Sequence, residues 1–237
     1  MKTEAIHTRL FKEKENLLQF VLEHIPVARE GSVIVVTSNI VALAEGRTAS
    51  FLEKEKVILE ESDWAIPTKY VWLTIKDGMF MAGAGTDESN AAGKLILLPK
   101  DSFKAADELR TALLSFYKIK KLGVMITDSR VLPLQRGVVG VAVGYAGFTG
   151  IKEYRGAPDL FGRPLKVTTV DVADSLATAA VLLMGEGNES RPLAVIEDAP
   201  LDFAEHVNKG ELVVPVHDDL YAPLFEKIVL KPKREEK

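Results

Sequence analysis

The chain has 237 residues, of which 47% are hydrophobic and 27% are charged. This length can bury a substantial core as one large domain or two small ones. The hydrophobic fraction is too high for a disordered chain, and no apolar run is long enough to cross a bilayer. Because cysteine is absent, we also exclude a disulfide framework, a thiolate nucleophile and a cysteine zinc site.

The formal net charge of -4 argues against nucleic acid as the main partner, because binding to a phosphate backbone calls for a basic face. Charged residues such as Lys2, Glu4 and Arg9 interrupt the N-terminus, which therefore lacks the apolar segment of a secretion signal. We expect a cytoplasmic protein that binds neither nucleic acid nor a membrane. Residues 231–237 mix basic and acidic side chains, which predicts a solvated end.

The first part of the chain predicts a helix, a strand and a second helix. Apolar residues recur at helical spacing over residues 17–25, and Pro26 ends that helix. Residues 32–37 are continuously apolar, which is typical of a strand covered on both faces. Ser38 and Asn39 begin the next helix, whose free N–H groups suit a phosphate or carboxylate. The alternative is that one of these two residues is an ordinary helix cap.

The middle of the chain contains a hairpin signal followed by a polar loop. Asp77 and Gly78 separate the apolar runs 70–75 and 79–82, whereas residues 51–69 give no clear pattern. The hairpin leads into G-A-G-T-D-E-S-N-A-A-G at 83–93, which has Asp87 at its centre. A strand at 94–98 and an amphipathic helix at 101–118, with Asp101 as its cap, are expected next.

Residues 122–147 are the stretch around which we expect the chain to be organised. The apolar run 122–126 leads to Asp128 and Ser129, and glycines then recur among β-branched residues. An acid and a hydroxyl after a strand are typical of oxygen ligands presented at the end of a sheet. The alternative is that Asp128 and Ser129 only start a turn. The former interpretation would bring Asp87 and Asp128 together around one divalent cation.

The last third predicts a turn-rich segment at 151–164, a strand at 165–170 and an alanine-rich helix at 171–184. The loop G-E-G-N-E-S-R-P follows at 185–192, with strands expected at 193–197 and 212–216. Because strands and helices interleave irregularly, we predict an α+β fold with mixed sheets and packed helices. Residues 1–237 are expected to form a single unit or two intertwined subdomains.

Three acidic loops, centred on Asp87, Asp128 and Glu186, offer hard oxygen ligands without histidine or cysteine nearby. Such ligands favour Mg²⁺ or Mn²⁺ over Zn²⁺. A metal of this kind usually bridges nucleotide oxygens and neutralises charge during phosphoryl transfer. The chain has no Walker A motif and no G-x-G-x-x-G between a strand and a helix, so its nucleotide site must be of a different kind.

Seven motifs occur in colinear order over most of the chain. They are V-V-T-S-N-I-V-A-L-A-E-G-R at 35–47, G-T-D-E-S-N at 85–90, I-T-D-S at 126–129, P-L-Q-R-G-V-V-G-V-A-V-G at 133–144, D-L-F-G-R-P-L-K-V-T at 159–168, V-A-D-S-L-A at 172–177 and L-M-G-E-G at 183–187. Together they resemble the F420-0:γ-glutamyl ligase family. The chain looks closest to a bacterial branch associated with γ-glutamate ligation in folate metabolism.

The resemblance implies a homodimeric ligase of coenzyme F420 biosynthesis or folate metabolism. Such an enzyme uses GTP and two divalent cations, Mn²⁺ or Mg²⁺, to join L-glutamate to a carboxylate acceptor through an acyl-phosphate. It implies catalytic and metal-binding roles for Asp87 and Asp128. Further implied metal ligands are Ser129 and Glu186. Implied nucleotide-binding residues are Ser38, Asn39, Asn90, Gly185 and Gly187.

The chain departs from the family pattern at several cationic positions. Many relatives have lysine in place of Asn39, and Ser-Lys is common where this chain has Ala42-Leu43. The family's F-G-R-P-W is R-V-L-P-L at 130–134. Fewer cations weaken triphosphate binding unless others substitute, and the candidates are Arg47, Arg130 and Arg136. The alternative function is therefore a family member that binds a nucleotide or metabolite without ligation.

Overall fold

The computed structural model describes residues 1–225, so the solvated end predicted at 231–237 lies outside the described residues. The chain divides into two compact units. Unit 1 comprises Met1–Gly46 and Pro99–Leu212, and unit 2 comprises Arg47–Leu98 and the described residues from Val213 onward. Among residues 1–225, we find no helix with both the length and the apolar character needed to span a membrane.

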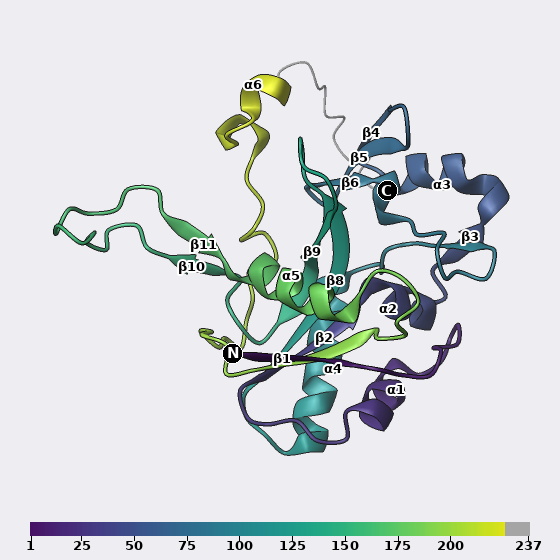
Figure 1. Ribbon diagram of the computed structural model, residues 1–237, viewed down its shortest axis with the longest axis horizontal. Helices are drawn as coiled ribbons and strands as arrows, with labels where there is room; N and C mark the ends of the chain where they lie inside the picture. The colour runs from purple at the N-terminus through teal and green to yellow at the C-terminus, as the bar shows by residue number, and fades with distance from the viewer. Residues whose placement is uncertain (226–237) are drawn as a thin grey trace, which may run out of the picture. The chain divides into compact units, whose positions relative to one another are not determined.

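Unit 1 is built on a five-stranded sheet with the strand order β1-β12-β2-β8-β9 (Figure 1). Its strands are β1 (Lys2–Ile6), β2 (Ser32–Thr37), β8 (Leu122–Val131), β9 (Val138–Ala146) and β12 (Leu193–Glu197). Strands β2 and β8 are parallel, and all other neighbours in the sheet are antiparallel. This mixed sheet confirms the predicted α+β class.

Four helices pack in unit 1, and the sequence predicted each of them. They are α1 (Leu17–His24), α2 (Ser38–Glu45), α4 (Ser102–Tyr117) and α5 (Val172–Met184). Asp101 caps α4 as expected, since its carboxylate accepts a hydrogen bond from the Lys104 N–H at 2.8 Å. The alternative that Ser38 or Asn39 caps α2 is wrong, because Thr37 is the N-cap residue and makes no side-chain cap bond.

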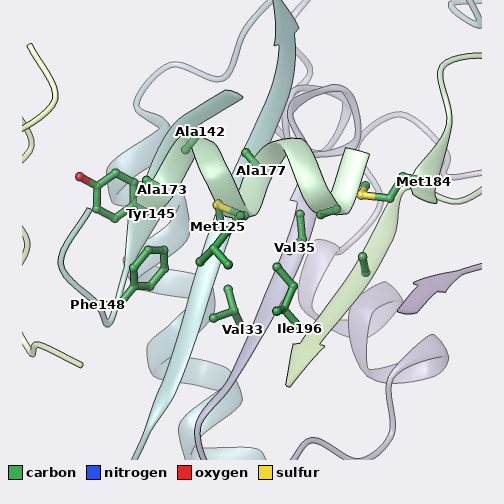
Figure 2. Close-up of a cluster of buried hydrophobic side chains, with 13 residues drawn as sticks. Val33, Val35, Met125, Ala142, Tyr145, Phe148, Ala173, Ala177, Met184 and Ile196 are labelled. Carbon is green, nitrogen blue, oxygen red and sulfur yellow. The ribbon is translucent and has the colours of Figure 1, made fainter. Parts of the chain in front are cut away.

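Helix α5 covers one face of the sheet with small side chains. Figure 2 shows Ala173 and Ala177 packed over Val33, Val35 and Met125, all of which are fully buried. Because alanine has a short side chain, the helix backbone can approach the sheet closely. Ile34 and Val36, which point to the opposite face of β2, are also fully buried. Both faces of β2 are therefore covered, as its continuous apolar run predicted.

The opposite face of the sheet packs against α4. Met125 and Tyr145 are paired across β8 and β9 and belong to the cluster under α5. The next pair, Ile126 and Gly144, points to the other face, because successive residues of a strand alternate. A Cβ atom on Gly144 would lie 2.4 Å from the carbonyl carbon of Ser102, at the start of α4. Only glycine leaves room for this contact.

A long hairpin, here called the arm, leaves the sheet of unit 1 between β9 and α5 (Figure 1). It consists of β10 (Ile151–Glu153), β11 (Thr169–Asp171) and the residues between them. The predicted strand at 165–170 was wrong over most of its length, since regular pairing begins only at Thr169. The part of the arm before β11 is instead held by local hydrogen bonds. One of them runs from the Leu165 N–H to the Ala157 carbonyl.

Unit 2 contains two small antiparallel sheets and short helices. Its elements are β3 (Thr48–Ser50), α3 (Lys54–Glu61), β4 (Trp64–Pro67), β5 (Trp72–Lys76), β6 (Met79–Ala82), β7 (Lys94–Ile96) and α6 (Ala222–Phe225). Strands β5 and β6 form the predicted hairpin, and Asp77 and Gly78 both have the positive φ values that a tight turn requires. The predicted strand at 212–216 was wrong. Pro215 lacks the N–H group of a strand and leads into a 3-10 turn at Val216–Asp218.

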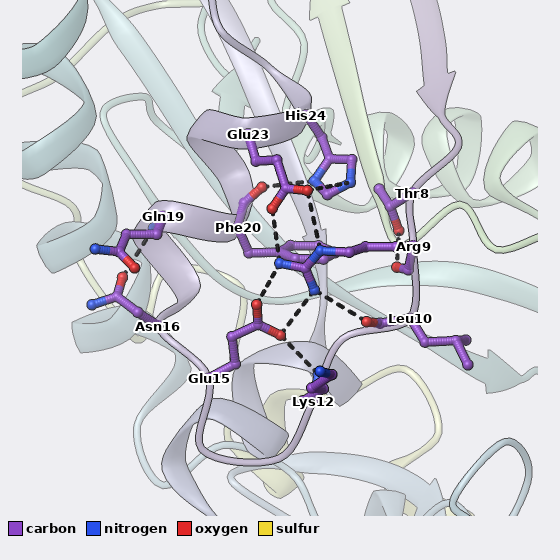
Figure 3. A network of polar contacts seen from close by, with 10 residues as sticks. All are labelled: Thr8, Arg9, Leu10, Lys12, Glu15, Asn16, Gln19, Phe20, Glu23 and His24. Carbon is purple, nitrogen blue, oxygen red and sulfur yellow. Dashed lines mark hydrogen bonds and ion pairs between the residues drawn. The ribbon is translucent and has the colours of Figure 1, made fainter.

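Arg9 organises a polar network that holds the segment after β1 against α1 (Figure 3). Its guanidinium donates to both carboxylate oxygens of Glu15 and of Glu23, and it lies 4.9 Å from the ring centroid of Phe20. The Lys12 N–H donates to Glu15 as well, at 2.9 Å. The hydrogen bonds from Arg9 and then Lys12 lower the pKa of Glu15 to about 2.

This lowered pKa predicts how the network affects stability. Because the folded protein favours ionised Glu15, the stabilisation is complete above its ordinary pKa and is lost as the pH falls through about 2. We expect Glu15→Gln to lower the melting temperature by up to about 4 °C at neutral pH. The difference from the parent protein should shrink as the pH is lowered through the acid range in a thermal-melt series.

Glu108→Gln provides the matched control. Glu108 pairs with Lys104 at 3.7 Å, and both side chains are 68% exposed. Exposed pairs of this kind contribute little, so this variant should melt with the parent at every pH. If Glu15→Gln also followed the parent curve throughout, the Arg9 network would have no part in stability.

Candidate functional site

The candidate site lies at the carboxyl edge of the parallel strands β2 and β8. Thr37 and Thr127 are paired, so the residues that follow them, Ser38 and Asp128, occupy neighbouring positions. In sheets with parallel strands, ligands commonly bind at this edge, where the chain leaves the strands for loops and helix N-termini. The fold thus brings the Ser38-Asn39 and Asp128-Ser129 pairs together within unit 1.

Asp128 and Ser129 lie inside β8, which continues to Val131. The alternative interpretation, that they start a turn, is therefore wrong. Strand β9 supplies the missing partner, because Asp128 pairs with Val141 and Ser129 pairs with Gly140. Both side chains are half-buried, and the Asp128 carboxylate accepts the Ser129 N–H at 2.8 Å. The acid is thus presented on a paired strand, which positions it more firmly than a loop would.

The pairing of β8 with β9 shifts by one residue immediately before Asp128. Ile126 pairs with Gly144 but Thr127 pairs with Ala142, so Val143 is an extra residue on β9. Such bulges re-aim the side chains that follow them and are frequent beside functional sites. Helix α5 holds this irregular region in place. The Asp174 carboxylate accepts the Ala142 N–H at 2.8 Å, and the Thr178 hydroxyl donates to the Gly140 carbonyl at 2.8 Å.

Two half-buried acids at the start of α5 give this region its charge. Asp171 is the N-cap residue, and its carboxylate accepts the Asp174 N–H at 2.8 Å. Burial raises the pKa of both Asp171 and Asp174 above the ordinary value. The second oxygen of Asp174 lies 3.4 Å from the Arg130 guanidinium on β8, which opposes part of that rise. The acids and this arginine form one electrostatic group beside the Asp128 strand.

The loop after α5 also returns to this edge of the sheet. The Thr37 N–H donates to the Pro192 carbonyl at 3.0 Å, and β12 then pairs with β2. Glu186, Gly185 and Gly187 are exposed within the loop. The Gly187 N–H, predicted to contact a nucleotide, donates to the Glu189 carboxylate at 2.8 Å. This N–H group therefore already binds an anionic group in the folded chain.

Helix α2 begins directly at the same edge. Ser38 is buried and Asn39 is half-buried. The N-cap residue Thr37 makes no side-chain cap bond to the first turn of the helix. This arrangement is compatible with the predicted anion site at Ser38 and Asn39, whose roles stay predictions.

The loop centred on Asp87 belongs to unit 2. Asp87 forms a two-way backbone bridge with Ile96, with both N···O distances at 2.8 Å. Its carboxylate accepts the Ser89 N–H at 2.7 Å, and Asn90 is exposed with a φ of 52°. Local hydrogen bonds thus hold the acid at a defined place in its loop. Asn90 adopts the left-handed conformation that asparagine tolerates better than most residues.

Among residues 1–225, no group of three or more acidic or histidine side chains is arranged to hold a metal ion. The predicted ligands are divided between the units, with Asp87 in unit 2 and Asp128, Ser129 and Glu186 in unit 1. Within unit 1, Asp128 lies at the carboxyl edge between the start of α2 and the loop after α5. This is an oxygen-donor site with an arginine beside it.

Asp174 and Glu189 are residues of this region that were not singled out from the sequence. Asp174 lies in the first turn of α5, where an acid also interacts favourably with the helix dipole. Its position in V-A-D-S-L-A is therefore indistinguishable from an ordinary helix start. Glu189 is one of two acids in the loop 185–192, and only the folded loop shows which of them meets the Gly187 N–H.

The fold and the site define an α+β protein with an acidic site at the edge of a mixed sheet. A family model described as F420-0:Gamma-glutamyl ligase matches residues 5–198. The chain is 31% identical over 246 residues to a coenzyme F420:L-glutamate ligase of Methanocaldococcus jannaschii, covering 93% of this chain and 97% of the relative. The chain therefore belongs to the F420-0:γ-glutamyl ligase family, and it is an enzyme of the ligase class.

Other relatives with the same name support this assignment. The protein of Archaeoglobus fulgidus is 35% identical over 208 residues, which are 79% of this chain and 83% of the relative. The protein of Methanococcus maripaludis strain C6 is 38% identical over 171 residues, or 71% of this chain and 68% of the relative. The resemblance drawn from the motifs is thus confirmed at the level of the family.

The contact between β9 and α5 makes a prediction about the strand pair that carries Asp128. A Cβ atom on Gly140 would lie 2.6 Å from both the Ala177 carbonyl oxygen and the Val181 Cβ atom. Because neither neighbour is the end of a flexible side chain, we expect Gly140→Ala to destabilise the protein by about 1–3 kcal/mol. Chemical denaturation measures this change.

Gly210→Ala is the matched control, since the nearest atom to its added Cβ would lie at 3.7 Å. This variant should have the same free energy of unfolding as the parent protein. Equal stability of Gly140→Ala and Gly210→Ala would show that α5 does not clamp β9 as described.

Proposed function

We propose that this protein is a nucleotide-dependent and metal-dependent ligase that joins L-glutamate to a carboxylate acceptor. GTP is the proposed phosphoryl donor and Mn²⁺ or Mg²⁺ the proposed metal. Membership of the ligase family, together with the placement of Asp128 at the carboxyl edge of β2 and β8, supports this proposal. The half-buried carboxylate and the absence of cysteine fit a hard divalent cation better than zinc.

The chemistry needs activation because a carboxylate is a poor acyl donor. In the first step, an acceptor carboxylate oxygen forms a bond to the γ-phosphorus of GTP while the bond to the β-phosphate oxygen breaks and GDP leaves. The amine of glutamate then attacks the acyl carbon, and phosphate departs with the electrons of the C–O bond as the amine loses a proton. A divalent cation supplies charge neutralisation on the phosphate oxygens.

The proposed roles of the residues follow the family resemblance. Asp87 and Asp128 carry the metal and are the catalytic pair. Ser129 and Glu186 are further proposed metal ligands, and the proposed nucleotide-binding residues are Ser38, Asn39, Asn90, Gly185 and Gly187. Within unit 1, Ser38 and Asp128 directly follow the paired residues Thr37 and Thr127. Their proximity supports a shared function for the proposed site residues of this unit.

The acceptor is proposed to resemble F420-0, with a folate-like carboxylate as the second candidate. The relatives named above are coenzyme F420:L-glutamate ligases, which favours the first. The altered R-V-L-P-L sequence at 130–134 motivates the second, because it follows the acidic site directly. A closer relation to the bacterial folate branch stays a prediction.

A homodimer is part of the proposal. The arm of unit 1 exposes large apolar side chains, with Leu160 100% exposed and Phe161 83% exposed. Its base is held by two hydrogen bonds to the Gly150 carbonyl, from Val172 and Ala173. Apolar side chains on an anchored hairpin are suited to burial against a second copy of the chain. Cytoplasmic localisation likewise remains a prediction.

A second candidate function is nucleotide or metabolite binding without ligation. The resemblance favours it, because it implies that lysines common in the family are replaced here by Asn39 and Leu43. Thermal-shift measurements with GTP and Mn²⁺ detect binding, because a ligand selective for the folded state raises its stability. Clear binding without phosphate release for any carboxylate acceptor would favour this candidate over the ligase.

The ligase proposal predicts the requirements for turnover. Phosphate should be released, and the ligated product should appear, only when GTP, Mn²⁺ or Mg²⁺, a carboxylate acceptor and L-glutamate are all present, because phosphate leaves the acyl-phosphate when the amine attacks. Removal of the metal with a chelator should abolish both signals. A phosphate-release assay combined with mass spectrometry of the acceptor measures them. No turnover with any F420-0-like or folate-like acceptor would contradict the proposal.

The proposed metal ligands predict a matched pair of variants. We expect Asp87→Asn and Asp128→Asn each to abolish Mn²⁺-dependent nucleotide binding while the fold stays intact, since each removes a ligand carboxylate. The apo melting temperatures should hold or rise slightly, because fewer close negative charges remain. The two losses should not add, since residues that act as one unit cannot be lost twice.

Calorimetric titration and thermal melts of the two single variants and the double variant provide the measurement. Asp107→Asn, at an exposed position on α4, is the control and should bind like the parent. The proposed ligand roles fail if either single variant unfolds or if both bind Mn²⁺ and GTP normally.

A further inference from the structure

Arg130 is a half-buried cation with few partners. A guanidinium has five N–H donors, yet among residues 1–225 Arg130 makes a single hydrogen bond, at 3.4 Å to Asp174. Its Nε atom is buried and has no hydrogen-bond partner in the described part of the chain. Leaving a buried donor unpaired is costly, so such a group calls for an explanation.

The position of Arg130 suggests what its remaining donors bind. Arg130 follows Asp128 by two residues in β8, so the two residues lie close together on the same strand. A cation beside an acid that is proposed to hold a metal is well placed for the phosphate oxygens of the metal-bound nucleotide. Guanidinium groups suit this role because their donors match phosphate oxygens two at a time.

The other two arginines that were candidates to replace the family lysines are less suited. Arg47 already donates to the Glu61 carboxylate at 2.7 Å and to the Leu98 carbonyl at 3.1 Å. Arg136 is exposed in the turn between β8 and β9, and no hydrogen bond within residues 1–225 orients it. Arg130 alone of the three combines partial burial, a fixed strand position and uncommitted donors.

Asp174 is the residue that orients Arg130. One of its carboxylate oxygens accepts the Ala142 N–H next to the bulge in β9, and the other faces the guanidinium. The first bond fixes the carboxylate, because a backbone N–H on a paired strand cannot rotate away. Asp174 therefore holds the Arg130 side chain from a rigid point, at the level of the strand that carries Asp128.

We propose that Arg130 binds the nucleotide phosphates, and that Asp174 is its positioning residue. This inference rests on the proposed function, because it names the residue that recognises the phosphate part of that nucleotide. The ion pair with Asp174 is long and single, so the guanidinium keeps donors for a ligand while its direction is set. A pre-oriented side chain loses less entropy on binding than a freely rotating one.

The affinity for a non-hydrolysable GTP analogue in the presence of Mn²⁺ tests this proposal on the full chain. Arg130→Ala should raise the Kd by about tenfold or more, which is about 1.4 kcal/mol. Arg130→Lys should recover part of the affinity, since it restores the charge but not the planar donor fork. Asp174→Asn keeps an oxygen for the Ala142 N–H but loses the ion pair, and should raise the Kd by about threefold or more.

A double-mutant cycle separates positioning from a purely structural role. Because Asp174 acts through Arg130, Asp174→Asn should have no further effect on the Kd when Arg130 is already alanine. Arg29→Ala and Glu197→Gln are matched controls. They remove an ion pair at 3.3 Å near the other end of β2 and should leave the Kd unchanged. Thermal melts confirm that each variant is folded.

Several results would overturn the inference. Arg130→Ala and Arg130→Lys binding like the parent would remove Arg130 from the site while the ligase proposal, measured by turnover of the parent, still stood. An equal effect of Asp174→Asn with and without Arg130, or tighter binding by Asp174→Asn, would show that Asp174 does not act by orienting Arg130. Failure of the parent itself to bind the analogue would overturn the nucleotide role together with this inference.

Discussion

The bulged pairing of β8 with β9 is the constraint on which the site depends. Val143 is left over where the register shifts, and the strands would be free to slip there without a clamp. Helix α5 supplies the clamp through Asp174 and Thr178, and Gly140 lets the helix backbone come close enough to act. The alanine-rich core of α5 and the direction of the Asp128 strand are therefore two parts of one packing arrangement.

This arrangement connects packing to chemistry. Strand β2, buried on both faces, aligns β8 in parallel and places Asp128 beside the start of α2. The loop after α5 returns to the same edge because β12 pairs with β2. Acids that are half-buried near such an edge are stabilised by positive charge nearby, and Arg130 provides it. The cation that satisfies Asp174 in the folded chain is thus also the one closest along the strand to Asp128.

Local signals in the sequence were sufficient for much of the fold. The apolar run of β2, the Asp77-Gly78 turn and the Asp101 cap each carry their own physical cause. Pairing over long distances was not predictable. Edge strand β1 alternates charged and small residues, and the polar end of β8 is a strand only because β9 lies beside it. The opposite error occurs around Pro215. The apolar run 212–216 was predicted to be a strand, but it leads into a 3-10 turn.

The candidate site divides in the same way. Asp128 and Ser38 stood out because polar residues after apolar runs are visible in the sequence, and the fold places them side by side. Asp174 could not be predicted as a site residue from the sequence. One of its partners is a backbone N–H, that of Ala142, which no side-chain motif marks, and the other, Arg130, lies 44 residues away in the chain. Only the three-dimensional structure brings together the first turn of α5, the bulge in β9 and Arg130.

The most direct measurement of the central claim is the anomalous scattering of Mn²⁺ in crystals grown with MnCl₂ and a non-hydrolysable GTP analogue. The account predicts a manganese peak within coordination distance, about 2.0–2.5 Å, of an Asp128 carboxylate oxygen. It also predicts density for nucleotide phosphates on the Arg130 side of that ion. A bound metal and nucleotide that contact neither Asp128 nor Arg130 would contradict it.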